Sequence, residues 1–191
     1  MNEAILLILW SVYFYLHSLL AAPSVKAFFK MSFSIESDLA YRIGYNLFAF
    51  TGILILLWLQ YIISSAILFK RSLISDCIAF GIMAPGLVLM IISIRNYDWP
   101  SFIGLTKEKK YSLVITGMNK YVRHPLYSST MLFASGFFIW QPYLKNLSLL
   151  ILMWIYLAIG IIYEERKLVN TYGATYKDYQ KTVKKMIPFI W

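Results

Sequence analysis

The sequence predicts an all-α, polytopic membrane protein with about five transmembrane helices and a C-terminal cytoplasmic amphipathic helix. Of its 191 residues, 60% are hydrophobic and only 14% are charged, whereas soluble domains are about 45–50% apolar and about 25% charged. Several apolar runs also approach or exceed the roughly 20 residues that a helix needs to cross a bilayer. We therefore expect one integral, multi-pass domain over residues 1–191, with three spans in residues 1–94 and a second half in residues 95–191.

Five apolar segments define the predicted spans. Pro23 closes the first segment, and a short polar loop is expected to follow it. Pro85 is an expected kink inside the third segment, tolerated where other helices surround it. The fourth segment is short for a span unless it is tilted or extended. The predicted spans cover residues 4–22, 39–64, 73–94, 127–140 and 144–163.

The distribution of lysine and arginine predicts the orientation of these spans. With five spans, fifteen of the 18 Lys and Arg residues fall on one side, and only Lys70, Arg71 and Lys145 fall on the other. Cytoplasmic loops carry the excess of basic residues. The polar segment 95–123 and the C-terminal tail should therefore both face the cytoplasm, where they can meet.

The net charge of +9 does not indicate nucleic-acid binding. The basic residues collect in loops and in the tail, where they favour anionic lipid headgroups, and no basic, aromatic-interleaved soluble module is present. We expect membrane lipids as partners and no nucleic acid. The single cysteine leaves no cysteine cluster for a metal, and no metal site is predicted. The oligomeric state is not predicted.

The C-terminal tail has helical periodicity. Apolar and aromatic residues recur at spacings of four, four, three and four, which places them on one helix face. Gly173 interrupts the run and is expected to end the helix that continues from the fifth span. The residues on this face are Leu168, Tyr172, Tyr176, Tyr179 and Val183.

Two polar clusters stand out, "RHPLY" at residues 123–127 and "YEERKL" at residues 163–168. Acidic residues at membrane depth are costly and are usually paired or functional. Neighbouring helical residues point about 100° apart, so Glu164 and Glu165 cannot share one partner. We expect one to bind a cation on a ligand and the other to pair with Arg123 or hold a nearby loop. The structural alternative is a solvated helix end, with Arg123 reaching the headgroups.

The stretch "GMNKYVRHPLYSS", followed by "EERKLVNTYGATYKDY", resembles the signature of the membrane-integral methyltransferases. The shared pattern is Arg-His-Pro-x-Tyr, then Glu-Glu, then Gly-x-x-Tyr-x-x-Tyr. The group includes isoprenylcysteine carboxyl methyltransferase, phospholipid N-methyltransferases, methanethiol S-methyltransferase and NnrU-like proteins. The stretches "NYDWPSFIGL" and "HSLLAAPSVK" are more similar to the NnrU and methanethiol S-methyltransferase branch.

This resemblance implies S-adenosylmethionine as the cofactor and assigns roles to particular positions. His124 and Tyr127 would contact the cofactor, and Gly117 would allow a close turn. On chemical grounds, Arg123 is the expected catalytic residue: its cation suits the carboxylate of the cofactor, and it could orient a carboxylate acceptor or lower the pKa of a thiol. Asn119 and Ser129 depart from the usual tyrosine and glycine of the pattern. The implied cofactor-binding residues are Leu113, Val114, Gly117, His124, Pro125, Tyr127, Glu164 and Glu165.

The implied function is an S-adenosylmethionine-dependent methyltransferase that acts on a small or lipid-soluble acceptor, which is a thiol, a prenylcysteine carboxylate or a lipid amine. Methyl transfer from a sulfonium neutralises charge, so a partly dehydrated pocket that aligns the reactants suits it. Two alternatives are an NADPH-dependent membrane reductase of the sterol-reductase type and a non-enzymatic NnrU-like protein. His17, midway along the first span, is expected to be a packing residue or to line an acceptor tunnel.

Overall fold

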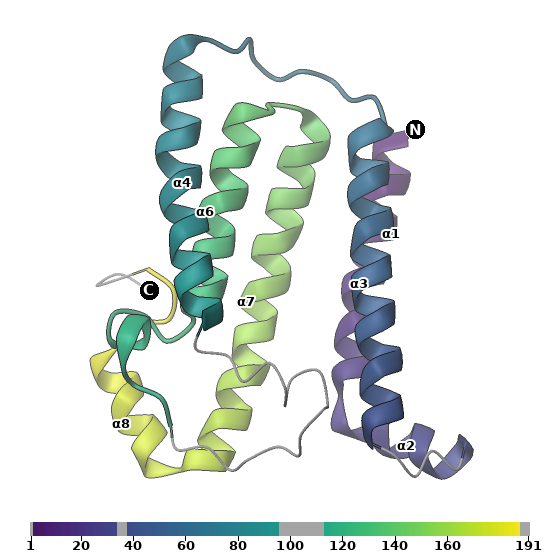
Figure 1. The fold of residues 1–191 in the computed structure, drawn as a ribbon, viewed down its shortest axis with the longest axis vertical. Coiled ribbons are helices and arrows are strands. Elements are labelled where there is room, and N and C mark those ends of the chain that lie inside the picture. Colours follow the sequence, from purple (N-terminus) through teal and green to yellow (C-terminus); the bar gives the residue numbers. More distant parts are fainter. Residues whose placement is uncertain (1, 34–37, 96–112, 188–191) are drawn as a thin grey trace. The chain divides into compact units, whose positions relative to one another are not determined.

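A computed structural model describes residues 2–33, 38–95 and 113–187, and in these ranges the fold is helical (Figure 1). The described residues divide into two compact units. The first holds α1 (Asn2–Ala21), α2 (Pro23–Phe33) and α3 (Asp38–Ile62), and the second holds α4 (Leu73–Arg95), the 3-10 helix η1 (Gly117–Lys120), α6 (Pro125–Trp140), α7 (Leu144–Tyr172) and α8 (Ala174–Thr182).

Four helices in the described ranges are long and apolar enough to cross a membrane, namely α1, α3, α4 and α7. This confirms the prediction of an all-α, multi-pass membrane protein. The fourth predicted span corresponds to α6, which has 16 residues. At 1.5 Å per residue α6 is about 24 Å long, against a hydrocarbon core of about 30 Å. The count of five spans therefore stays a prediction.

A polar and aromatic seam joins α1 to α3 in the first unit. Trp10 Nε1 donates a hydrogen bond of 2.9 Å to Gln60 Oε1, both being buried. Further along, the Tyr45 hydroxyl lies 3.2 Å from His17 Nε2, and the His17 ring stacks on Tyr13. These contacts agree with a packing role for His17.

The prediction of a polar loop after Pro23 is wrong, because the chain forms the helix α2 over these residues. Proline lacks an amide N–H, but the first turn of a helix has no acceptor for that group. Pro23 therefore begins α2 directly after α1 ends at Ala21. The helix end before Pro23 was predicted, but the helix start that proline also permits was not.

Small residues let α4 and α6 approach closely in the second unit. A Cβ atom on Gly86 would lie 2.6 Å from the backbone nitrogen of Phe133, and one on Gly136 would lie 2.8 Å from the Ala79 carbonyl oxygen. Ala79 and Ser129 are fully buried. This is the small-residue packing by which transmembrane helices associate, and α4 passes through Pro85 without a break.

We expect Gly86→Ala to destabilise the protein by about 1–3 kcal/mol, because a rigid backbone would meet the new methyl group. Gly81→Ala on the same helix is the matched control, since no atom lies within 4 Å of a Cβ at Gly81. There the substitution should be neutral or slightly stabilising, as alanine favours a helix more than glycine does. Thermal unfolding in detergent measures both, and equal effects would contradict this packing.

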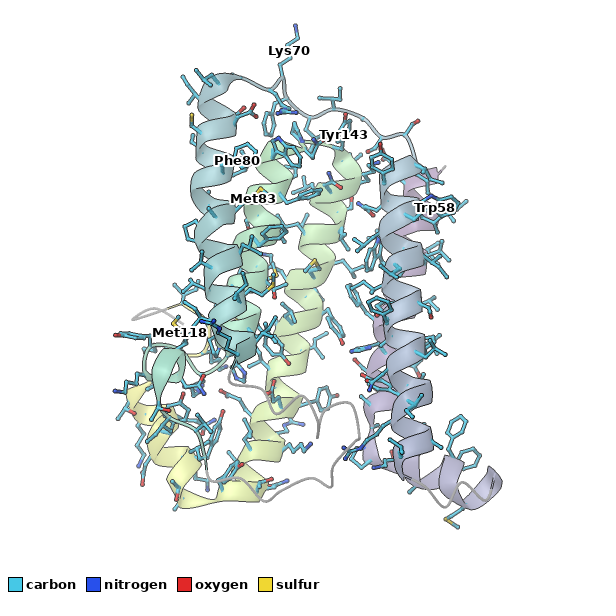
Figure 2. The ribbon with its side chains drawn as sticks, in the orientation of Figure 1. Trp58, Lys70, Phe80, Met83, Met118 and Tyr143 are labelled. Carbon is cyan, nitrogen blue, oxygen red and sulfur yellow. The ribbon has the colours of Figure 1, made fainter. Side chains whose placement is uncertain are left out.

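The direction of α6 determines where the polar clusters lie within the second unit. Figure 2 shows Lys70 and Tyr143 at one end of this unit and Met118 at the other. At the first end, the Leu68 amide donates to the Pro142 carbonyl at 2.8 Å, and the rings of Phe80 and Trp140 are 5.7 Å apart. The segment that precedes α6 is therefore at the end where α4 finishes.

The helix α7 continues beyond the fifth apolar segment, which ends at residue 163, and stops at Tyr172. Gly173 follows with a φ of 58°, in the left-handed region that favours glycine. This confirms Gly173 as the predicted stop. Glu164 and Glu165 therefore lie inside a continuous helix, two turns before its end, where the backbone fixes the directions of their side chains.

Candidate functional site

The site is centred on His124, a buried residue that directly precedes α6. Its ring lies between the two glutamates of α7. Nδ1 is 3.6 Å from Glu164 Oε2, and Nε2 is 3.3 Å from Glu165 Oε1. The structure therefore brings together the two polar clusters that the sequence separates by forty residues.

Arg123 and Glu165 form a buried ion pair. Arg123 Nε donates to Glu165 Oε1 at 2.7 Å, and the two side chains are only 6% and 12% exposed. The second carboxylate oxygen accepts a hydrogen bond of 3.2 Å from Gln180 Nε2 on α8. This confirms the expected pairing of one glutamate with Arg123, and it shows that both oxygens of Glu165 are engaged by the protein.

Glu164 has a different environment. Its side chain is 40% exposed, and its Oε2 atom has no hydrogen-bond partner within the described ranges. Next to it, the rings of His124 and Tyr127 stack with centroids 5.6 Å apart and an interplanar angle of 8°. Glu164 is thus the less fully paired of the two glutamates: its side chain is partly exposed, and its buried Oε2 atom has His124 Nδ1 nearby at 3.6 Å.

The other predicted site residues form the segment that leads into α6. Gly117 begins η1 with a φ of 63°, and Pro125 is the first residue of α6. Asn119 Nδ2 donates to the Val114 carbonyl at 2.8 Å, and the Tyr179 hydroxyl donates to the Asn119 carbonyl at 2.5 Å. Asn119 therefore ties this segment to α8. Leu113, the first residue described after the gap, is half-buried.

An open groove of about 460 Å³ lies beside α7 and α8. Of the residues predicted for the site, it contains Glu165. Both charged and apolar side chains line it, so it could accept a polar molecule with an apolar part. The lining residues are Ile162, Glu165, Arg166, Val169, Asn170, Gln180 and Lys185.

Several contributors were missed in the sequence. Gln180 holds Glu165, and carbonyl groups of the tail accept hydrogen bonds from Arg123 and His124. Every residue carries a carbonyl group, so no sequence pattern could have marked these acceptors. Gln180 did have a weak signal, because it adjoins Tyr179 on the predicted tail helix.

Burial raises the pKa values of two tyrosines of α8 that pack at the site. Desolvation raises the pKa of Tyr179 from 10.0 to about 12. Desolvation, and then the negative charge of Glu165, also raise the pKa of Tyr176. Both residues are buried, as expected for residues on the apolar and aromatic face predicted for the tail.

These shifts predict a loss of stability in alkaline solution. Above pH 10 the tyrosines ionise in the unfolded chain while Tyr179 stays protonated in the folded protein up to about pH 12. Because the unfolded state then binds fewer protons, the free energy of unfolding should fall as the pH rises between these values. Unfolding midpoints across this range measure the fall, which should be shallower in Tyr179→Phe. Identical slopes would contradict the shift.

Comparison with known proteins identifies the family. Residues 74–175, more than half of the chain, match the family model described as phospholipid methyltransferase. A helical membrane protein with a histidine held between two glutamates is thus placed among the membrane-integral methyltransferases. The chain belongs to the phospholipid methyltransferase family and is an integral membrane methyltransferase. The predicted resemblance is confirmed, and the reductase alternative is not favoured.

Three curated relatives are similar to this chain. Methanethiol S-methyltransferase of Crocosphaera subtropica is 26% identical over 188 residues, which cover 91% of this chain and 70% of the relative. Protein-S-isoprenylcysteine O-methyltransferase of Schizosaccharomyces pombe is 33% identical over 44% of this chain and 36% of its own length. Protein-S-isoprenylcysteine O-methyltransferase B of Arabidopsis thaliana is 31% identical over 46% of this chain and 45% of its own. No solved structure gives a significant match.

Proposed function

We propose that the protein transfers a methyl group from S-adenosylmethionine to a small thiol. The extent of the matches supports this choice of acceptor. The relative named for methanethiol matches 91% of the chain, whereas the two relatives named for isoprenylcysteine match 44% and 46% of it. The similarity that extends over both halves of the chain is thus to a small-thiol enzyme. The wider class is a small or lipid-soluble acceptor.

The residues at the site fit the proposed cofactor. The amino-acid part of S-adenosylmethionine carries an ammonium group, and Glu164 has a partly exposed carboxylate beside His124 that could receive it. Hydrogen bonds between an ammonium and a carboxylate are among the stronger ones in proteins. We assign His124 and Tyr127 to the walls beside the cofactor, and Leu113, Val114 and Gly117 to main-chain contacts with it.

The cofactor supplies a methyl group activated by a sulfonium. The protein's part is to align the two reactants and to limit water around them, since charge disappears in the reaction. A thiol acceptor has to lose its proton before it attacks. Because a small thiol is partly apolar and the donor is water-borne, a site at the membrane boundary serves both. We place this site and the C-terminus on the cytoplasmic side, which fifteen of the 18 Lys and Arg residues favour.

The test has two stages, both on the full chain in detergent or nanodiscs. Calorimetry should show binding of S-adenosylmethionine and no comparable binding of NADPH. Transfer of label from the methyl group of S-adenosylmethionine should then be fastest to methanethiol, in a panel with a prenylcysteine and phosphatidylethanolamine. A faster reaction with either lipid-like acceptor would overturn the small-thiol assignment, and binding without any turnover would favour a non-enzymatic protein.

A further inference from the structure

We infer that the tail segment Val183–Met186, called the strap here, is part of the cofactor site, and that Arg123 is a positioning residue that ties the strap to Glu165. This inference rests on the proposed function and deepens it. It replaces direct contact between Arg123 and the acceptor, the role expected from the chemistry of its side chain, with a role in holding His124. The observations that carry it are contacts between the strap and the segment that leads into α6.

Main-chain contacts join the strap to the Arg-His pair. The Arg123 amide donates to the Lys184 carbonyl at 2.8 Å, and the His124 amide donates to the Lys185 carbonyl at 3.0 Å. Both amides precede the first turn of α6, where amide groups have no acceptor within the helix. The strap therefore satisfies two donors at the residues that the site depends on. Ser128 Oγ extends the contact by donating to the Met186 carbonyl at 2.7 Å.

The Arg123 side chain holds the strap from the other direction. While Nε binds Glu165, one terminal nitrogen donates to the carbonyls of Gln180, at 3.3 Å, and Val183. The guanidinium is thus surrounded by protein acceptors at 6% exposure of the side chain. Nothing in this arrangement points the cation toward a second molecule, and all of it joins α7, α8 and the strap.

An apolar anchor ends the strap. Met186 is 2% exposed and belongs to one buried cluster with Met131 of α6 and Ile161 of α7. Removing this side chain from water favours the seated strap, because burial of an apolar side chain is stabilising. The strap is therefore a seated element of the fold, and its main chain sets the position of the His124 ring between the two glutamates.

Coupling between strap and cofactor follows from this geometry. If His124 contacts the cofactor only when the strap is seated, then bound cofactor must in turn favour the seated strap, because coupling between two binding events is reciprocal. Binding of the cofactor should therefore protect the strap from proteolysis, because a protease can cleave the strap only after it leaves its seated position. The strap contains its own reporters, since trypsin cleaves after lysine and both Lys184 and Lys185 lie in it.

Limited trypsin digestion of the full chain tests the coupling without measuring turnover. Saturating S-adenosylmethionine should slow cleavage after Lys184 and Lys185 at least fivefold. Cleavage after Lys70 and Arg71, which are exposed at the opposite end of the second unit, should not change. S-adenosylmethionine that binds in calorimetry but leaves the strap sites as sensitive as before would overturn the inference.

Variants provide the second arm. Gln180→Glu places a second carboxylate beside Glu165, and a chain ending at Thr182 lacks the strap altogether. Each should raise the Kd and the KM for S-adenosylmethionine more than tenfold and leave the KM for the acceptor unchanged. The control Lys181→Gln removes an exposed ion pair with Asp178 and should change neither. If the shortened chain does not fold, Gln180→Glu alone tests the inference.

The outcomes that contradict the proposed function and the inference differ. Wild-type protein that does not bind S-adenosylmethionine would refute the proposed function, whereas variants that bind it normally would refute only the role of the strap.

Discussion

Replacement of Glu165 by alanine is expected to cost about 3–5 kcal/mol of stability, the range seen when one partner of a buried ion pair is removed. Arg123 is 6% exposed, so its charge would stay buried without the carboxylate that compensates it. Gln180 would also lose the acceptor for its amide. The yield of folded protein should fall with the unfolding midpoint in detergent, and donor binding should be lost as a consequence.

An exposed ion pair in the same unit provides the control for this substitution. Arg71 and Asp76 are 3.0 Å apart, but their side chains are 44% and 29% exposed. Pairs of this kind contribute about 0–1 kcal/mol, so Asp76→Ala should have a small effect. If Glu165→Ala and Asp76→Ala lowered the unfolding midpoint equally, the Arg123–Glu165 pair would not be the structural centre described here.

Glu164→Gln, one residue before Glu165, is expected to affect cofactor binding rather than stability. It should weaken binding of S-adenosylmethionine more than tenfold and leave the yield and the unfolding midpoint nearly unchanged. The physical reason is that the Glu164 side chain is 40% exposed and its contact with His124 Nδ1 is long, at 3.6 Å, so the amide that replaces the carboxylate costs little structural support. A neutral amide cannot replace a carboxylate as the partner of an ammonium group.

Calorimetry with S-adenosylmethionine and thermal unfolding on the same samples separate the two profiles. His124→Ala should also weaken binding more than tenfold, because the imidazole lies between both glutamates. Should Glu164→Gln and His124→Ala both bind S-adenosylmethionine as the wild type does, the cofactor site lies elsewhere. The groove beside α7 and α8 would then be the next place to examine.

The long helices were largely predictable, because an apolar run of about 20 residues usually indicates a helix that crosses a membrane. The continuation of the last span into a polar helix was also predictable, from the helical spacing of the tail and from Gly173. Residues after Tyr163 are mostly polar, yet Glu, Arg and Lys are good helix formers, and α7 continues through them to Tyr172. The helix α2 was missed, because the prediction used proline only as a helix end and not also as a helix start.

The sequence predicted which residues form the candidate site. It did not predict which of them contact each other. Helical geometry predicted that Glu164 and Glu165 would not share a partner, and this is wrong in one respect: the His124 ring reaches both carboxylates, one through each nitrogen, while Arg123 meets only Glu165. Which of them meets Arg123 depends on the rotation of α7 relative to α6, and that is decided by packing over the whole length of both helices. The strap was invisible for another reason, because its acceptors are main-chain carbonyls whose position depends on the path of the chain.

The contact between Arg123 and Val183 bridges 60 residues of sequence. During synthesis, the Arg-His pair leaves the ribosome before α7, α8 and the strap exist. In the site that we propose, inserted helices alone would not give a competent catalyst, and activity would begin only after the last of these elements has folded back. Chains that end between the Arg-His pair and the strap would enter the bilayer without a complete site, so unfinished copies should consume no methyl donor.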